Sequence, residues 1–384
     1  MDGKKAFIYS EEYFKFDYGP FHPLRIERLQ LTHDLITAYG LLDLDGLLRV
    51  GTVPADPAEI AAFHRPEYLD ILKKCSRGDC HDPGEAQAYG LGPGDNPIFP
   101  GLWEWSLLTA GASLQAARLV ADRECTLAFN MAGGLHHAHA RKASGFCYIN
   151  DIVLAILELR KRGLRVAYVD LDAHHGDGVQ EAFYDTDQVL TISLHQHGRT
   201  LFPGTGFVYE TGRGRGQGFS VNAPLLPGTD DELFLHVFGN LVPDLIRAYE
   251  PDVLVTQLGV DALRTDPLTN LCLTTNGFLS AADMLKDLGL PWLALGGGGY
   301  NIVNVARAWT LFWAKVNDVE PPEDLPESFR DKIAPQGYRE KKLRDQPYCV
   351  DKTTWAEART AARQVIETVR ETLLPVIARS RRRF

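Results

Sequence analysis

Short apolar runs alternate along the chain with longer segments in which apolar residues recur every three or four positions. Continuous apolar runs are typical of strands buried on both faces, and the longer period is typical of amphipathic helices. The predicted strands are residues 5–9, 125–130, 165–170, 188–194, 253–258 and 292–296. The predicted helices are residues 24–39, 104–122, 149–162, 230–249, 276–288 and 301–316. This alternation predicts an α/β fold with a mostly parallel sheet and helices on both faces.

Neither an internal repeat nor a Ser/Gly-rich linker interrupts the chain before residue 317, which favours one domain there. Three long loops are predicted, and loops of that length in a compact domain are commonly functional. They are residues 78–101, 195–218 and 262–275. From Asp318 the composition becomes polar, and a last amphipathic helix is predicted over about 353–376. We therefore expect a main domain over 1–317 and a C-terminal extension, 318–384, whose final helix packs on the same domain.

Composition and charge narrow the class of protein. The chain has 384 residues, of which 45% are hydrophobic and 23% charged, an ordinary globular balance. Its formal net charge of −10 argues against a general nucleic-acid binder. The N-terminus leads straight into the strand at 5–9 without a signal-peptide pattern, and no apolar stretch is long enough for a membrane span. With six scattered cysteines, we expect a cytoplasmic protein with reduced thiols and no membrane partner.

Polar side chains with catalytic or ligand chemistry follow four of the predicted strands. The carboxyl ends of parallel strands are where ligands bind in doubly wound sheets, so these residues are expected to converge. In chain order they are His136, His137, Asp170, Asp172, His174, Asp177, Asp261 and Tyr300. Convergence from four separate strands is stronger evidence for a site than any one motif.

Asp172 and His174 are expected to bind a metal ion. They are two residues apart, so in an extended segment their side chains share a face. Asp261 would complete a set of three ligands, the number that catalytic zinc sites use while leaving a position for water. The same donors accept ferrous iron, so the ligands alone leave the ion open. The simpler alternative for the pair is a solvated turn.

Asp170 and Asp177 are then left to pair with the two adjacent histidines, His136 and His137. Such carboxylate–imidazole pairs fix the histidine tautomer and raise its basicity. One histidine of the pair can act as general base and later as general acid on an attacking water. His139 and His175 are not included in this catalytic set.

Tyr300 follows four glycines, which permit close approach of the backbone. Its phenol could donate to an oxygen that develops negative charge, although a packed tyrosine is the alternative. A phosphate loop is disfavoured because no matching motif accompanies the glycines. Phe146 and Phe202 lie in predicted loops and could flank a channel for an aliphatic substrate, or belong to the core. Asp95, in the loop 78–101, could hold a backbone N–H or an amine at the rim.

These motifs resemble the class I histone deacetylase family, particularly its bacterial deacetylase-like and acetoin-utilization branch. The resemblance runs from about Tyr9 to Ala314. The motifs that carry it are His22-Pro23, Gly133-Gly134-Leu135-His136-His137, Gly145-Phe146-Cys147-Tyr148-Ile149-Asn150-Asp151, residues 170–178, Phe202-Pro203-Gly204-Thr205-Gly206 and Leu295-Gly296-Gly297-Gly298-Gly299-Tyr300. It implies a single arginase/deacetylase-type domain with a parallel sheet of about eight strands.

The resemblance also implies a role for each site residue. Zinc would be bound by Asp172, His174 and Asp261. His137 would be the general base and acid, and His136 would orient the water. Tyr300 would polarise the acetyl carbonyl, and Asp170 and Asp177 would be the carboxylate partners of the histidines. The substrate would contact Gly145, Phe146, Phe202 and Leu268 in a tunnel and Asp95 at its rim, with Arg28 near an internal exit channel.

Potassium is implied as a second cation in two sites. The first would use Asp170, Asp172, His174, Ser193 and Leu194, and the second would use carbonyl groups around Phe183, Thr186, Val189 and Phe219. The departures from the family pattern are one extra residue within 199–201, a different loop over Leu263–Thr274 and the tail after residue 317.

The resemblance implies zinc-dependent hydrolysis of N-acetyl-lysine, or a related acyl-lysine, in proteins or peptides, with release of acetate. One alternative is a small-molecule amidohydrolase acting on acetylated amines such as acetylpolyamines. An alternative of another class is a non-catalytic regulatory module on the same fold, but no expected catalytic position has been lost. An arginase-like enzyme with two metals is disfavoured by the histidine pair, because it would need more carboxylate ligands.

Overall fold

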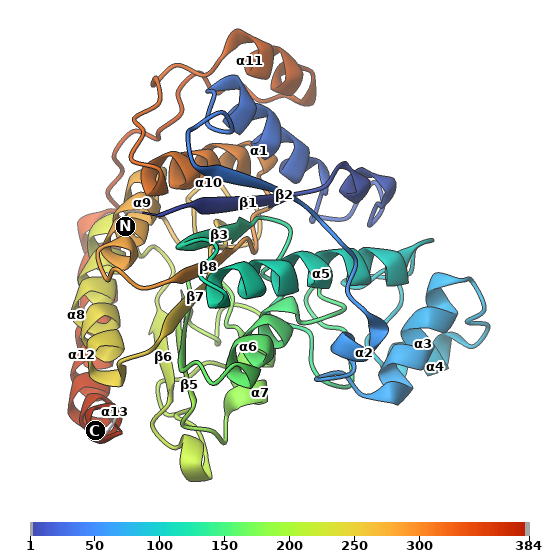
Figure 1. Ribbon diagram of the computed structural model, residues 1–384. Helices are drawn as coiled ribbons and strands as arrows, with labels where there is room; N and C mark the ends of the chain where they lie inside the picture. The colour runs from blue at the N-terminus through green and yellow to red at the C-terminus, as the bar shows by residue number, and fades with distance from the viewer. Residues whose placement is uncertain (1–2, 381–384) are drawn as a thin grey trace.

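The computed structural model describes residues 3–380, so the last four residues of the predicted C-terminal extension lie outside the described part. The chain forms a single α/β domain built on one sheet of eight strands, in the order β2-β1-β3-β8-β7-β4-β5-β6 (Figure 1). Every neighbouring pair in the sheet is parallel. The strands are β1 (Lys5–Tyr9), β2 (Leu47–Gly51), β3 (Leu127–Asn130), β4 (Val166–Asp170), β5 (Val189–Gln196), β6 (Ser220–Leu225), β7 (Val253–Gln257) and β8 (Trp292–Leu295). The predicted fold class is therefore confirmed.

Six of these strands were predicted from their apolar runs, and the two that were missed are the edge strands. β2 is half-exposed and carries Arg49, so it lacks a continuous apolar run. β6 is buried but alternates Ser220, Asn222 and Pro224 with apolar residues. A proline lacks the backbone N–H of a central strand and is tolerated at a sheet edge.

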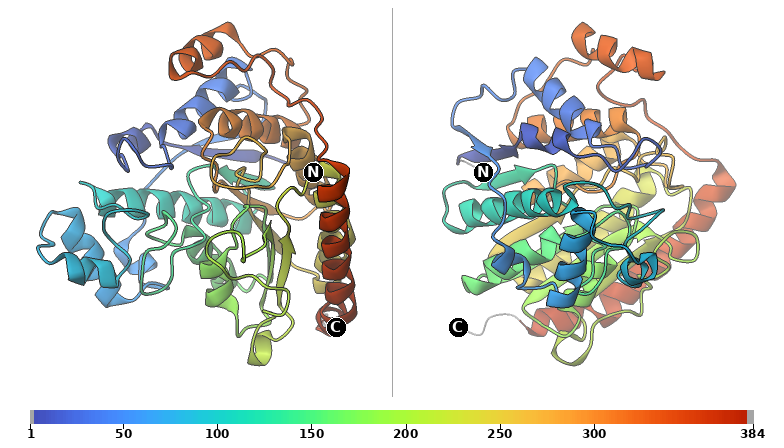
Figure 2. Two further views of the ribbon diagram at one scale, coloured as in Figure 1. Left: turned by 180° about the vertical axis from the view of Figure 1, so that it is seen from behind. Right: turned by 90° about the vertical axis from the view of Figure 1, so that its right-hand side faces the viewer.

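The helices cover both faces of the sheet (Figures 1 and 2). On one face α5 and α6 pack together and contact β3 and β4; on the other α1, α10, α9 and α8 pack in succession. All six predicted helices are present, with small shifts at their ends. The helices are α1 (Glu27–Ala38), α2 (Pro57–Ile60), α3 (Pro66–Ser76), α4 (Pro83–Ala88), α5 (Leu102–Ala121), α6 (Asp151–Lys161), α7 (Asp177–Phe183), α8 (Asp231–Tyr249), α9 (Thr275–Lys286), α10 (Ile302–Val316), α11 (Glu327–Ile333), α12 (Lys352–Thr372) and α13 (Leu374–Arg379).

Alternate residues of each strand supply the two apolar layers. In β3 the Phe129 ring lies 5.1 Å from the Phe312 ring of α10, whereas Ala128 belongs to the layer beneath α5. That second layer contains the small residues Ala112 and Ala116, which let α5 approach the sheet closely. Because both faces are buried, the central strands read as continuous apolar runs.

The C-terminal segment lies along the outside of α8 (Figure 2). The predicted helix over 353–376 is divided at Leu373 into α12 and α13, because Pro375 has no backbone N–H for a continuous helix. The Arg165 guanidinium stacks 3.8 Å from the Tyr249 ring of α8 and donates to the Ser380 hydroxyl. The division of the chain at residue 317 stays a prediction.

Three further expectations concern the cysteines, the long loop over 78–101 and membrane-spanning helices. All six cysteines are free. The predicted long loop over 78–101 contains the short helix α4, which begins after the capping side chain of Asp82. Within residues 3–380, no helix combines the length and apolarity that a bilayer span requires.

The packing of α12 against α8 predicts a stability contribution from Val369, which is fully buried. Val369→Ala should lower the free energy of unfolding by about 1.5 to 3 kcal/mol, from lost burial and the cavity left behind. Thermal or urea unfolding measures this, with Val53→Ala as the control because Val53 is 62% exposed. Equal effects of the two substitutions would contradict the packing described.

Candidate active site

The site residues lie beyond the carboxyl ends of β3, β8, β7 and β4, which are consecutive in the sheet. β3 leads to the histidine pair and β8 to Tyr300. β7 leads to Asp261, and β4 leads to the carboxylate–histidine cluster from Asp170 to Asp177. The four strand ends named from the sequence therefore meet at one edge of the sheet.

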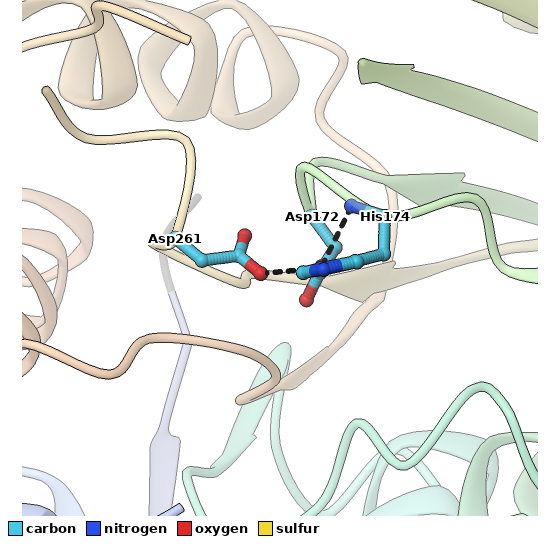
Figure 3. A group of neighbouring side chains, drawn as sticks. All are labelled: Asp172, His174 and Asp261. Carbon is cyan, nitrogen blue, oxygen red and sulfur yellow. Dashed lines mark hydrogen bonds and ion pairs between the residues drawn. The ribbon is translucent and has the colours of Figure 1, made fainter. Parts of the chain in front are cut away.

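Asp172, His174 and Asp261 form a compact group whose potential ligand atoms all lie within 4.8 Å of one another (Figure 3). The His174 Nδ1 atom is 2.8 Å from Asp261 Oδ2 and 3.1 Å from Asp172 Oδ1. Asp172 is 1% exposed and Asp261 is 0% exposed. The structure thus brings together the three residues predicted as ligands.

The chemistry of this group fits a divalent cation. Two buried carboxylates share one imidazole, and within residues 3–380 no Lys or Arg forms an ion pair with either carboxylate. Burial, together with the negative charge of Asp172, raises the pKa of Asp261. Buried charges are costly unless they are paired or coordinate a metal, so a bound cation would relieve this repulsion. The donors suit zinc or ferrous iron.

Neighbouring groups fix the orientation of both carboxylates. Asp172 Oδ2 accepts from Gln257 Nε2 at 2.6 Å and from the Gly298 backbone N–H at 2.7 Å. Asp261 Oδ1 accepts from the Ala173 backbone N–H at 2.8 Å, which leaves Oδ2 facing His174. A Cβ atom at Gly298 would lie 2.4 Å from Asp261 Oδ2, so the third of the four consecutive glycines must lack a side chain.

His136 and His137 each bond one carboxylate through Nδ1. His136 Nδ1 is 2.8 Å from Asp170 Oδ2, and His137 Nδ1 is 2.7 Å from Asp177 Oδ1. The two Nε2 atoms face each other at 3.0 Å. Both imidazoles are therefore held with Nε2 directed into the site.

The two histidines differ in their affinity for a proton. Burial alone would lower the pKa of His136, but the charges of Asp170 and Asp172 raise it to about 9. Burial and the neighbouring His136 together lower the pKa of His137 to about 4. The nearby carboxylates thus favour a proton on His136, whereas His137 more readily stays neutral and so can accept one.

The Tyr300 hydroxyl belongs to the same site. The Tyr300 ring lies 6.4 Å from the His174 ring and 5.6 Å from the Phe146 ring, nearly perpendicular to both. Burial and the nearby charge of Asp261 raise the pKa of Tyr300 well above its usual value. The phenol therefore keeps its proton and can donate a hydrogen bond.

The residues predicted to line a substrate tunnel are also brought together. Gly145 and Phe146 both have positive φ and form the centre of a tight two-residue turn between Ser144 and Cys147. A Cβ atom at Gly145 would lie 2.4 Å from the His137 ring, so this glycine lets the turn approach the histidine. The Phe202 ring lies 5.1 Å from the His137 ring.

Leu268, Asp95 and Phe146 line one surface hollow, at the mouth of the predicted substrate tunnel. Phe202 contacts the histidines but does not line this hollow, and it is 43% exposed. The five predicted substrate residues thus surround the approach to the buried site. Their roles stay predictions.

Arg28 and the predicted potassium residues lie nearby. Arg28 is buried, donates to the Gly299 carbonyl at 2.9 Å and stacks on Trp309. Ser193 is paired with Asp170 in the sheet register and contacts His195. The carbonyls of Phe183 and Phe219 accept backbone N–H groups from Thr186 and Thr191. The exit channel and both potassium sites stay predictions.

Four further residues support the site; three of them were missed from the sequence, and His139 was left out of the predicted catalytic set. The Tyr168 hydroxyl donates to Asp170 Oδ2 at 2.6 Å, and Gln257 donates to Asp172. His139 bonds Asp177 and Glu181. Asp266 is buried, accepts from the Tyr300 backbone N–H at 2.7 Å and accepts from the Leu268 backbone N–H at 3.0 Å. Only strand alternation signalled Tyr168, which lies two residues before Asp170.

Comparisons with known proteins agree with this geometry. Residues 22–316 match the family model for the histone deacetylase domain. The chain is 41% identical to histone deacetylase B of Dictyostelium discoideum over 321 residues, 84% of this chain and 75% of that protein. It is 42% identical to histone deacetylase 9 of Arabidopsis thaliana over 326 residues, 85% of this chain and 76% of that protein.

A solved structure shows the same likeness. The crystal structure of an HDAC homolog from Aquifex aeolicus superimposes with a TM-score of 0.87 at 34% identity, covering 95% of this chain and 99% of that chain. Together with the eight-stranded parallel sheet and the buried Asp-His-Asp group, these matches show that the chain belongs to the histone deacetylase family.

Proposed function

We propose that the protein is a zinc-dependent hydrolase that removes acetyl, or related acyl, groups from lysine side chains of proteins or peptides. The observation that carries the proposal is the buried Asp172–His174–Asp261 group beside the histidine pair and the Tyr300 hydroxyl. A metal group alone would suit many hydrolases. The added base and hydroxyl donor supply what amide hydrolysis requires.

A zinc ion held by these three residues would supply Lewis-acid polarisation of the acyl oxygen and lower the pKa of a water molecule. His137 Nε2 accepts the proton of the attacking water, while Asp177 holds the ring through Nδ1. The Tyr300 hydroxyl donates to the acyl oxygen as that oxygen becomes negative. Protonated His137 then returns the proton to the lysine Nζ as the C–N bond breaks.

The approach to the site suits an acyl-lysine. Aromatic rings of Phe146 and Phe202 stand beside Tyr300 and His137 and would pack on the aliphatic lysine stem. The exposed Asp95 carboxylate at the mouth can accept a backbone N–H of the substrate. We propose protein or peptide substrates over acetylated small amines on this basis.

The experiment that tests the function is hydrolysis of acetyl-lysine peptides by the purified, zinc-loaded protein. Acetate release is measured beside release from acetylspermidine at equal concentration. Higher kcat/KM for the peptide supports the proposal, and higher kcat/KM for the polyamine supports the small-molecule alternative. Loss of both activities in a zinc-loaded protein would contradict catalysis and favour a regulatory module.

Removal of one ligand should remove the metal. Asp261→Asn replaces a buried carboxylate by a neutral amide, so zinc content should fall from about one per chain to a small fraction. Emission spectrometry of the dialysed protein measures this. Asp43→Asn, at an exposed ion pair, is the control and should retain zinc. Equal zinc in both variants would contradict the assigned ligand group.

Loss of the proposed base or hydroxyl donor should slow the reaction without loss of metal. His137→Ala and Tyr300→Phe should each lower kcat by about 10²- to 10⁴-fold, the usual range for general bases and oxyanion donors. Tyr209→Phe is the matched control, because it removes the hydroxyl of an exposed tyrosine. A fully active Tyr300→Phe variant would exclude the hydroxyl from the mechanism.

Asp266 should act as a positioning residue. Its two oxygens anchor the backbone of Tyr300 and of Leu268, and an amide has only one oxygen to accept with. Asp266→Asn should therefore lower kcat/KM by about 10-fold, the effect of one hydrogen bond to a charged group. Zinc content should stay unchanged. Parallel loss of zinc and activity would instead indicate a role in the metal group.

A further inference from the structure

An apolar hollow lies at the mouth of the proposed acyl-lysine channel. Its volume is about 590 Å³, and its apolar walls include Pro20, Phe21, Pro23, Pro97, Phe146 and Leu268. Phe21 is 98% exposed, more than any other large apolar side chain in residues 3–380. An exposed aromatic ring beside a catalytic channel is a surface that a ligand would cover with a gain in free energy.

The segment that carries Phe21 is fixed against the channel wall. His22 Nδ1 accepts from the Leu24 backbone N–H at 3.1 Å, so Nε2 carries the proton and donates to the Asp95 carbonyl at 3.2 Å. The His22 ring also meets the Phe146 ring edge-on at 4.5 Å. The Tyr18 hydroxyl donates to the Phe146 carbonyl. These contacts hold the segment in place before any ligand arrives, which lowers the entropy cost of binding.

The hollow shares Phe146 with the proposed acyl-lysine channel, because this ring also contacts Tyr300. Phe146 faces Tyr300 on one side and the hollow on the other, and Leu268 lines the hollow while its backbone is anchored by Asp266. A ligand whose acyl-lysine reaches Tyr300 would therefore place its neighbouring residue over the hollow. Free acetylated amines carry no such residue.

The mouth also has a second, more polar hollow of about 430 Å³. It shares Gly94 and Asp95 with the apolar one and includes the polar side chains of Gln87, Asn96 and Ser144. The two hollows meet at Asp95, the residue proposed to hold the substrate backbone. A peptide chain crossing the mouth would thus present one neighbour of the acyl-lysine to an apolar surface and the other to a polar surface.

The charge of Asp95 also disfavours an acidic side chain next to the acyl-lysine. Among residues 3–380, Asp95 is the only carboxylate that lines the apolar hollow, and neither lysine nor arginine does. An acidic residue placed there would lie near a like charge without a compensating cation. An apolar residue would instead bury its surface against Phe21.

We propose that Phe21 is a specificity-determining residue that packs against an apolar side chain directly adjacent to the acyl-lysine in a peptide substrate. The inference rests on the proposed acyl-lysine hydrolysis and names the sequence context that this site selects. Phe21 takes no part in bond cleavage, so its contribution is to peptide binding and appears mainly in KM.

The experiment compares acetyl-lysine peptides that differ only in one neighbour of the acetyl-lysine, leucine or aspartate. The exchange is made in one series before and in another after the acetyl-lysine, and acetyl-lysine amide serves as the substrate without neighbours. In one series the wild-type enzyme should prefer the leucine peptide by about 10-fold or more in kcat/KM. Phe21→Ala should lower kcat/KM for the leucine peptide about 5- to 10-fold, consistent with loss of most of one aromatic contact. Acetyl-lysine amide should be hydrolysed at an unchanged rate.

Tyr209→Ala is the matched control, because it removes an exposed aromatic ring from a different hollow. It should leave all substrates unchanged. Phe21→Leu keeps an apolar side chain and should retain most of the preference for the leucine peptide.

Three results would overturn the proposal. One is an equal loss on leucine, aspartate and amide substrates, which indicates a general structural effect of Phe21. Another is a change in oligomeric state on gel filtration with no change in peptide preference, which makes the hollow a contact between copies. A third is hydrolysis of acetyl-lysine amide or acetylspermidine but of neither peptide, which leaves the metal-dependent chemistry standing. Zinc-loaded protein inactive on every substrate contradicts the proposed function itself.

Discussion

The burial of negative charge at one edge of the sheet is the constraint on which the site depends. Asp170, Asp172 and Asp261 are almost fully buried, and Asp177 lies close by. Their hydrogen-bond partners within residues 3–380 are histidines, backbone N–H groups, a tyrosine and a glutamine, and the buried Arg28 acts on Asp172 and Asp261 only through longer-range charge. Unpaired buried ions cost several kcal/mol each. A protonated histidine and a metal ion held by Asp172, His174 and Asp261 would supply the compensating positive charge.

Sheet order and glycine placement make that concentration of charge possible. β3, β8, β7 and β4 are far apart in the sequence but consecutive in the sheet, so their carboxyl ends deliver side chains to one point. Gly145, Gly176 and Gly298 lie where a Cβ atom would come within 2.4 Å of His137, Asp170 and Asp261 respectively. Because glycine has no side chain, the loops can pack closely around the histidines and carboxylates at these points.

The sequence predicted the inner strands and the principal site side chains because both depend on local signals. A strand buried on two faces is a continuous apolar run, and its carboxyl end is followed at once by the candidate site residues. Edge strands β2 and β6 carry mixed residues and gave no such signal. Tyr168 and Gln257 lie within predicted strands and belong to no motif, and only tertiary structure shows that they bond Asp170 and Asp172.

The loops that line the apolar hollow are separate from the segments that carry the proposed metal ligands, the histidine pair and Tyr300. Phe21 and Pro97 belong to loops outside the sheet, whereas His137, Asp261 and Tyr300 follow its central strands. Under the proposed function, substitutions in these loops would alter which peptide binds without moving Asp172, His174 and Asp261 or the histidine pair. Phe146 is the residue at which the two parts meet, since its ring faces Tyr300 and its backbone carbonyl accepts from Tyr18. Because Phe146 has a positive φ, this turn is sensitive to substitution, and under the proposed function a change in it would alter catalysis and peptide selection together.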